Sequence, residues 1–198
     1  MAVSTQDLKK LQDSSTLRKE LNIDIKWRIL TSKGGKARIV AYQDARDVQR
    51  VLDYVCGPEN WSNEPRNLDG KMYMSLGINT EHSGWVYKAD VGIETNIEAV
   101  KGEASDAFKR ASIMWGIFRD VYDTEYIVLD VQGKYPVTPD GVLLKTPEAI
   151  GLYCNSISQP LGYLKRYYKV AKSLLEKNED AMQAFKTLGN FTKQNFIS

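Results

Sequence analysis

Strict alternation of apolar and polar residues in two pairs of segments constrains the fold of this chain more than any other feature. Residues 22–30 and 36–42 alternate around the turn at residues 34–35, and residues 71–78 and 85–93 alternate around a short polar loop. Successive side chains of a β-strand point to opposite faces, so each segment predicts a strand with one buried face. The two adjacent glycines at 34–35 suit the positive φ angles of a tight hairpin turn. The pattern therefore predicts two β-hairpins.

Outside these hairpins the apolar spacing changes to three and four residues, which is typical of helices. Residues 5–21, 44–55 and 97–118 follow this spacing, and the last of them carries the longest apolar stripe. Two hairpins in sequence favour an antiparallel sheet over a parallel one. We therefore expect an α+β fold, in which an antiparallel sheet made of the two hairpins is covered by helices on one face.

Composition divides the chain into three parts. Residues 1–130 hold the predicted hairpins and helices and form the expected core. Residues 131–147 contain three prolines and two glycines with little periodicity, which predicts a linker. Residues 148–198 are basic, and helical spacing over residues 161–175 predicts a helical tail.

Cysteine and histidine are scarce. The two cysteines lie far apart and there is one histidine, which argues against a disulfide framework and against a zinc or other histidine-rich metal centre. The first twelve residues are polar, and no apolar run approaches the roughly 18 residues of a membrane helix. We expect a soluble protein of a reducing, cytoplasmic compartment, with no membrane contact and no metal or other cofactor.

Positive charge is concentrated locally rather than overall. Residues 1–130 contain 18 Lys and Arg against 20 Asp and Glu, and residues 131–198 contain 9 against 5. Binding to a phosphate backbone would therefore need a local groove. The candidate cations, on the polar faces of predicted elements, are Arg28, Lys36, Arg38, Lys101, Lys109 and Arg110. Taken singly, each is more simply a solvated surface residue, and Glu103 and Asp106 are spaced to neutralise the long helix by i,i+3 and i,i+4 pairing.

A second group of cations lies in the predicted tail. Residues 161–172 interleave three tyrosines with basic residues, among them Lys165, Arg166 and Lys169. Such a segment can stack bases and contact phosphates, and it fits equally well an amphipathic helix that docks on the core or on a partner.

The acidic residues give a weaker alternative, a metal-dependent nuclease. Asp90, Glu94, Glu98, Glu103 and Asp106 would have to converge on one point, and their spacing gives no sign of this. The chain has no GxxxxGK[ST] phosphate loop, which disfavours an ATP-driven motor, and no serine has an evident histidine base. We therefore expect a protein that is not an enzyme and has no catalytic residue.

The long helix carries a resemblance to a known family. Residues 101–116, which read Lys-Gly-Glu-Ala-Ser-Asp-Ala-Phe-Lys-Arg-Ala-Ser-Ile-Met-Trp-Gly, resemble the corresponding helix of the Rad-fifty-two family of single-strand annealing proteins, phage-borne members included. Residues 90–92 resemble the family's entry into that helix. Residues 25–28, with the Gly-Gly turn, and residues 60–62 look like its first hairpin and the segment after its second helix. The likeness covers roughly residues 16–130.

The resemblance implies a β-β-β-α core that assembles into a homo-oligomeric ring or spiral, with single-stranded DNA in a continuous positive groove. The family's groove cations match Arg28, Lys109 and Arg110. Such a groove holds the backbone and leaves the bases free to pair, so annealing in recombination and DNA repair needs neither ATP nor a metal. The family's outer DNA face is not expected here, because Glu81 and His82 occupy the later hairpin turn.

The compact chain further favours a phage or prophage protein acting in a bacterial host cell, with the tail contacting DNA or the host's single-strand-binding protein. Two other classes stay open. One is a non-catalytic oligomeric interaction protein that binds no DNA specifically, and the other is the metal-dependent nuclease.

Overall fold

The protein consists of two compact units, each made of two separate stretches of chain. The structure, a computed structural model, describes residues 1–92 and 99–158, and for residues 99–101 it describes the backbone alone. Unit 1 comprises Met1–Asp24 and Gln43–Asp123, and unit 2 comprises Ile25–Tyr42 and, among the described residues, 124–158. The chain therefore passes between the units three times. Among the described residues, no helix is long and apolar enough to cross a membrane.

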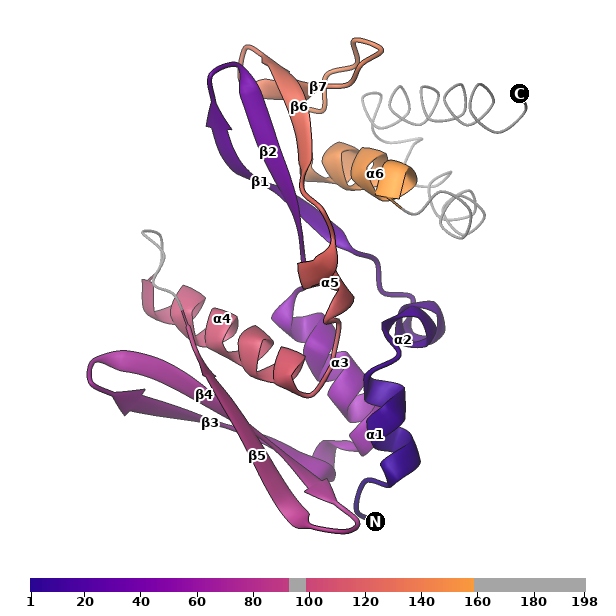
Figure 1. The fold of residues 1–198 in the computed structure, drawn as a ribbon, viewed down its shortest axis with the longest axis vertical. Coiled ribbons are helices and arrows are strands. Elements are labelled where there is room, and N and C mark those ends of the chain that lie inside the picture. Colours follow the sequence, from indigo (N-terminus) through magenta and orange to yellow (C-terminus); the bar gives the residue numbers. More distant parts are fainter. Residues whose placement is uncertain (93–98, 159–198) are drawn as a thin grey trace. The chain divides into compact units, whose positions relative to one another are not determined.

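Unit 1 combines a three-stranded antiparallel sheet of order β3-β4-β5 with five α-helices and one 3-10 helix among its described residues (Figure 1). Its elements are α1 (Thr5–Leu11), α2 (Ser14–Leu21), α3 (Ala45–Cys56), η1 (Pro58–Asn60), β3 (Trp61–Leu68), β4 (Lys71–Thr80), β5 (Gly84–Val91), α4 (Ala99–Met114) and α5 (Asp120–Asp123). Helix α4 packs on β4 and β5. The succession β3-β4-β5-α4 has the β-β-β-α order that the resemblance implies.

Strand β3 is an element that the sequence pattern does not predict. Its residues are mostly polar and exposed, and it contains Pro65. It lies at the edge of the sheet, where a proline costs no ladder hydrogen bond if its nitrogen faces outward. Pairing of Trp61 with Ile78 and of Leu68 with Lys71 fixes its register on β4.

The helix expected over residues 5–21 is two helices. The Oδ1 of Asp13 accepts a hydrogen bond from the Thr16 backbone nitrogen at 3.0 Å, so this residue caps the start of α2. Capping satisfies a backbone donor that the first turn of a helix leaves free, which favours a new helix start at this point. Ser4 and Asp7 form a reciprocal capping box at the start of α1.

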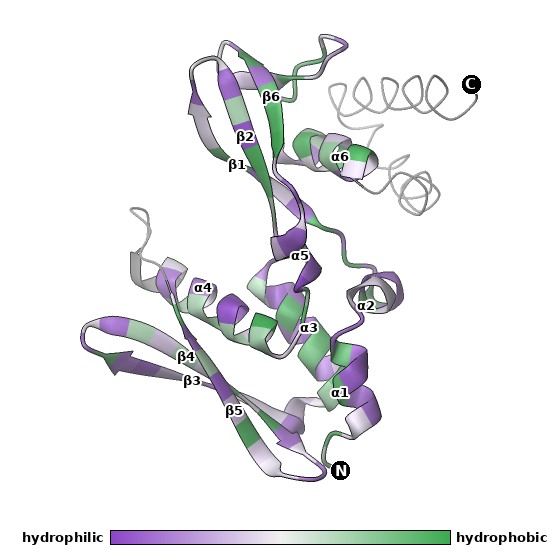
Figure 2. Cartoon of the chain, in the orientation of Figure 1, coloured by the Kyte–Doolittle hydropathy of each residue, from purple (hydrophilic) through white to green (hydrophobic). Residues whose placement is uncertain are grey.

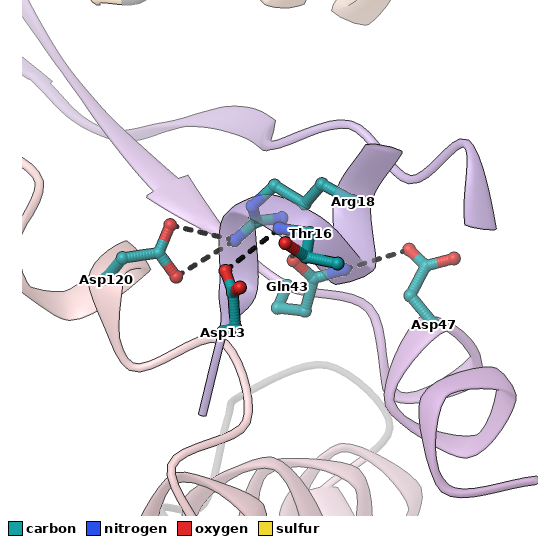
Figure 3. Close-up of polar contacts among 6 residues, drawn as sticks. All are labelled: Asp13, Thr16, Arg18, Gln43, Asp47 and Asp120. Atoms are coloured by element: carbon teal, nitrogen blue, oxygen red, sulfur yellow. Dashed lines mark hydrogen bonds and ion pairs between the residues drawn. The ribbon is translucent and has the colours of Figure 1, made fainter. Parts of the chain in front are cut away.

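A buried arginine joins three segments of unit 1 (Figure 3). In α2, Arg18 Nη1 donates to Gln43 Oε1 at 3.0 Å, and Nη2 donates to both carboxylate oxygens of Asp120 at 3.2 Å. Gln43 Nε2 in turn donates to Asp47 Oδ2 at 3.1 Å, and the guanidinium carbon lies 4.3 Å from the centroid of the Phe118 ring. Burial lowers the pKa of Arg18 from its ordinary value, and the Asp120 carboxylate opposes that shift. The network holds together chain segments that lie next to all three passages between the units.

Two glycines of the resembling segments have structural roles. A Cβ on Gly92 would lie 2.2 Å from the Glu103 carbonyl oxygen, so the absence of a side chain lets the end of β5 approach α4. Gly116 follows α4 with φ of +93°, and a Cβ there would lie 2.6 Å from Gln12 Cγ. The long helix, expected to continue to residue 118, ends at Met114 because the chain turns at this glycine.

Unit 2 is a four-stranded antiparallel sheet of order β1-β2-β6-β7 with α6 packed against it. Its elements are β1 (Lys26–Lys33), β2 (Lys36–Tyr42), β6 (Ile127–Gln132), β7 (Tyr135–Val137) and α6 (Pro147–Ser158). Figure 2 shows hydrophobic residues on β6 and α6. The buried core cluster consists of Ile25, Trp27, Ala37, Ile39, Leu129, Leu144, Ala149, Ile150, Tyr153 and Cys154.

Both expected hairpins are present, as β1-β2 and β4-β5, but they do not share one sheet. Strand β2 pairs on its second edge with β6, from Lys36 opposite Asp130 to Ile39 opposite Ile127, whereas β4 pairs on its second edge with β3. The expectation of a single sheet built from the two hairpins is therefore wrong. Alternation identifies the two faces of a strand, but it does not identify the strand's neighbours.

The structure also differs from the linker expected over residues 131–147. This stretch contains the end of β6, all of β7 and an isolated bridge between Val137 and Leu143. Pro136 lies in β7, an edge strand, and its carbonyl accepts a hydrogen bond from the Leu144 nitrogen at 2.8 Å. Leu144 is fully buried, so the stretch contributes to the core of unit 2. The tail helix expected over residues 161–175 lies outside the described residues.

A buried side-chain amide fixes α6 to β1. Asn155 Oδ1 accepts from Trp27 Nε1 at 2.7 Å, and its Nδ2 donates to the Ile25 carbonyl at 2.8 Å. Asn155 is only 2% exposed. Because a buried amide without partners would cost free energy, this pairing selects one position of α6 on the sheet.

Each unit contains one buried free cysteine, Cys56 in α3 and Cys154 in α6. Burial raises the pKa of each thiol to about 12. Since the thiolate is the reactive form, we expect neither to react with a chromogenic disulfide reagent at pH 8 in the folded protein, and both to react in denaturant. Fast reaction of either thiol without denaturant would contradict this burial.

Candidate nucleic-acid interface

Three of the predicted cations lie on one face of the unit 2 sheet. Arg28 on β1 pairs with Val40 on β2, so their side chains share a face. Lys36 and Arg38 lie at two-residue intervals before Val40 and therefore point the same way. On the opposite side, Trp27, Ile39 and Leu129 are buried in the core cluster that includes residues of α6. We call the exposed side the basic face; it carries Lys26, Arg28, Lys33, Lys36, Arg38, Val40, Tyr42, Tyr126, Val128 and Asp130.

The cations of the basic face have different partners. The Arg38 guanidinium carbon lies 3.6 Å from the centroid of the Tyr126 ring, and that of Arg28 lies 5.6 Å from the Tyr42 ring. Lys36 Nζ instead forms an ion pair with Asp130 Oδ1 at 2.5 Å. An arginine on an aromatic ring keeps its charge, whereas a lysine paired with a carboxylate is largely neutralised. Arg28 and Arg38 therefore attract an anion more strongly than Lys36 does.

The remaining predicted cations lie on α4 in unit 1, where one carboxylate serves two of them. Asp106 Oδ2 accepts from Arg110 Nε at 2.8 Å, and Asp106 Oδ1 lies 3.7 Å from Lys109 Nζ. The hydrogen bond to Asp106 is the main reason that the pKa of Arg110 is raised. Two cations share the charge of Asp106, so the predicted i,i+3 and i,i+4 neutralisation is present but incomplete. Lys101 lies in α4, and its side chain is outside the described residues.

The acidic residues have structural partners. Glu103 Oε1 accepts a hydrogen bond from the Met72 backbone nitrogen at 3.0 Å, and Asp90 Oδ1 accepts from the Val91 nitrogen at 2.7 Å. Glu94 and Glu98 lie outside the described residues. Within the described ranges, no group of three or more His, Cys, Asp and Glu side chains is arranged to hold a metal ion.

Lys88 is a half-buried cation that the sequence pattern does not single out. Its Nζ donates to the Met114 carbonyl at 2.8 Å and lies 4.3 Å from the centroid of the Trp115 ring. Burial lowers the pKa of Lys88, with a smaller contribution from the Arg119 charge. A cation at a helix C-terminus satisfies free carbonyls and interacts favourably with the helix dipole, so Lys88 stabilises the end of α4.

The candidate residues thus form two described groups, Arg28, Lys36 and Arg38 in unit 2 and Lys109 and Arg110 in unit 1. The tail candidates Lys165, Arg166 and Lys169 lie outside the described residues. Sequence reasoning missed Tyr126 and Val128. The signal that can identify their strand is the β-branched pair Ile127 and Val128, followed by the alternation of Leu129 and Val131 with Asp130 and Gln132.

Comparison with known proteins identifies relatives of this chain. The family described as Rad52/22 family double-strand break repair protein matches residues 9–137. A single-stranded DNA-binding protein DdrA from Deinococcus deserti is 31% identical over 126 residues, covering 58% of this chain and 59% of the relative. A protein of the same name from Deinococcus radiodurans is 38% identical over 90 residues, covering 44% of this chain and 42% of the relative.

The chain thus spans about half the length of these curated relatives. The family match is broader, since it covers well over half of this chain and includes β1, β2, β6 and β7 as well as most of unit 1. The chain belongs to the Rad52/22 family of double-strand break repair proteins.

Proposed function

We propose that this protein binds single-stranded DNA and anneals complementary strands in recombination and DNA repair, without nucleotide hydrolysis and without acting as an enzyme. Family membership and the names of the DdrA relatives support single-stranded DNA as the ligand. The observation that carries the proposal on this chain is the basic face, where Arg28, Lys36 and Arg38 lie together on exposed positions of one sheet.

The mechanism follows from charge and exposure. Cations that contact successive phosphates release counterions and hold a single strand extended. In this proposal the DNA backbone is contacted by Arg28 and Arg38 on the basic face and by Lys109 and Arg110 on α4. Lys36 contributes less, because it forms an ion pair with Asp130. A backbone held by its phosphates leaves the Watson–Crick edges of the bases available to a second strand. Annealing is then accelerated by aligning the DNA and raising its local concentration, and no covalent bond is made or broken.

The test is annealing of two complementary fluorescent oligonucleotides without ATP or magnesium. Wild type is expected to accelerate annealing, and Arg28→Ala and Lys109→Ala are each expected to slow it several-fold. Each variant should also reduce the dependence of log binding constant on log salt by about 0.7, the value for one phosphate contact on a single strand.

Lys19→Ala is the matched control, because Lys19 is an exposed cation of α2 outside both groups. It should anneal like wild type. A wild type that anneals no faster than bare DNA contradicts the proposal and favours an oligomeric interaction protein. Magnesium-dependent DNA degradation that Asp106→Ala abolishes favours the nuclease.

The resemblance leads to finer proposals. We propose that copies of the chain assemble into a ring or spiral, so that repetition multiplies a modest local charge, and native mass spectrometry of the full chain tests this. We also propose that Lys101 joins the α4 group and that Lys165, Arg166 and Lys169 contact DNA or a single-strand-binding protein. A phage or prophage origin, with action in the bacterial cytoplasm, completes the proposal.

A further inference from the structure

An exposed tyrosine on the basic face has an arginine stacked against it. Tyr126 immediately precedes β6 (Ile127–Gln132), and Val128 and Leu129 are the second and third residues of that strand. Leu129 is 7% exposed and belongs to the core of unit 2, whereas Tyr126 and Val128 are each 51% exposed. The Tyr126 ring is therefore directed away from the core, and core packing does not explain it.

The Arg38 side chain places a positive charge against this ring. Its guanidinium carbon lies 3.6 Å from the centroid of the Tyr126 ring, and Arg38 pairs across strands with Val128. A planar guanidinium against an aromatic ring, beside an exposed apolar side chain, makes a flat surface that carries positive charge. Nucleobases stack on aromatic rings and on guanidinium planes, and their phosphates are attracted by the same charge.

The surroundings favour a single nucleic-acid strand over an apolar partner. Arg28 lies on the same face with its own ring neighbour, Tyr42, at 5.6 Å. Lys36 forms an ion pair with Asp130, so each of the two arginines beside tyrosines offers more accessible positive charge than Lys36 does. An apolar protein partner would have to cover both charges, whereas a polyanion with exposed bases complements both the charge and the rings.

We propose that Tyr126 and Arg38 form a stacking site for one nucleobase of bound single-stranded DNA. The inference rests on the proposed function and adds a base contact to the phosphate contacts. In this site the base stacks on the Tyr126 ring, Val128 extends the apolar surface, and Arg38 holds the ring and contacts the adjacent phosphate.

The test compares two probes that differ only in bases, a fluorescent oligo-dT and an abasic oligomer of equal length and charge. Tyr126→Ala in the full chain should weaken oligo-dT binding roughly tenfold, the effect of losing one stacked base, while binding of the abasic oligomer and the salt dependence stay unchanged. Tyr126→Phe and Tyr126→Trp should retain oligo-dT binding. Arg38→Lys keeps the charge but loses the planar group, so it too should weaken oligo-dT more than the abasic oligomer.

Tyr54→Ala is the matched control. Tyr54 is 48% exposed on α3 in unit 1 and has Lys10 Nζ 4.5 Å from its ring centroid, but that lysine is paired with Glu20 at 3.0 Å. This variant should bind both probes like wild type. In addition, photocrosslinking of 5-iodouracil-substituted DNA should label the peptide that contains Tyr126.

Equal loss of both probes in Tyr126→Ala, or no loss of either, overturns the stacking site. Loss of oligo-dT binding in Tyr126→Phe as well would show that the aromatic ring is not the determinant and would also overturn it. If wild-type protein binds neither probe, the proposed function itself fails. If wild type binds both and the Tyr126 variants behave like it, the stacking site alone fails.

Discussion

Arg18→Met is expected to lower the free energy of unfolding of unit 1 by about 3 kcal/mol, at the lower end of the range for breaking a buried ion pair. The substitution keeps the apolar stem of the side chain and removes the donors to Gln43 and Asp120. Gln43 is then left buried with an unpaired oxygen. The Asp120 side chain is 42% exposed, so water can solvate its carboxylate, and this is why the lower end applies.

The cysteines distinguish which unit opens. Cys56 lies in unit 1 and Cys154 in unit 2, so thiol labelling in a urea series reports the unfolding of each unit separately. In Arg18→Met, the urea concentration at which Cys56 becomes labelled should fall, and the corresponding concentration for Cys154 should change less. Lys19→Met, at the exposed neighbouring position of α2, should stay within about 0.5 kcal/mol of wild type. An Arg18→Met protein whose Cys56 labelling matches that of wild type would show that the network does not stabilise the unit.

Asn155→Ala should destabilise unit 2 by about 2–4 kcal/mol. The change leaves the Trp27 indole N–H and the Ile25 carbonyl buried without their partner, and each such group costs about 1–3 kcal/mol. In this variant, Cys154 should become labelled at a lower urea concentration than in wild type, and Cys56 should change less, whereas Arg18→Met changes Cys56 more.

Two further variants make this result specific. Ser158→Ala removes a hydroxyl at the exposed end of the same helix and should change little. Combining Asn155→Ala with Trp27→Phe should cost less than the two single changes together, because the lost partners belong to one bond. Strict additivity would mean that the amide contributes through packing alone.

Local signals in the sequence were sufficient for much of unit 1 and for the first hairpin. Alternation located β1, β2, β4 and β5, and helical spacing located α3 and α4 to within a few residues. Alternation also predicts that Arg28, Lys36 and Arg38 lie on the polar faces of their own strands, because face is a local property of a strand. Alternation does not predict pairing, because β2 pairs with β6 and the elements from α3 to α5 of unit 1 lie between these two strands in the sequence.

Other errors have physical causes in particular residues. In β5 the apolar set was not the buried one: Trp85 and Tyr87 are 43% and 46% exposed, while Lys88 points toward α4 and its helix end. A lysine side chain is long enough for its amine to reach a helix carbonyl while its aliphatic part covers a tryptophan. An alternation pattern counts every lysine as a polar residue that faces solvent, so it does not predict this arrangement. The sequence pattern does not predict β3, because an edge strand needs little hydrophobicity. The pattern predicts a linker over residues 131–147, because prolines suit an edge strand as well as a loop.

The discontinuous make-up of unit 2 has a consequence for how the protein is made. The Trp27–Asn155 hydrogen bond spans 128 residues. At about 5–20 residues per second, the β1-β2 hairpin leaves the ribosome many seconds before α6. During that interval the apolar side of the hairpin lacks its cover, and the edge of β2 lacks β6. Until β6 is made, that edge is open to the β6 strand of another copy, so strand exchange between copies competes with the folding of unit 2.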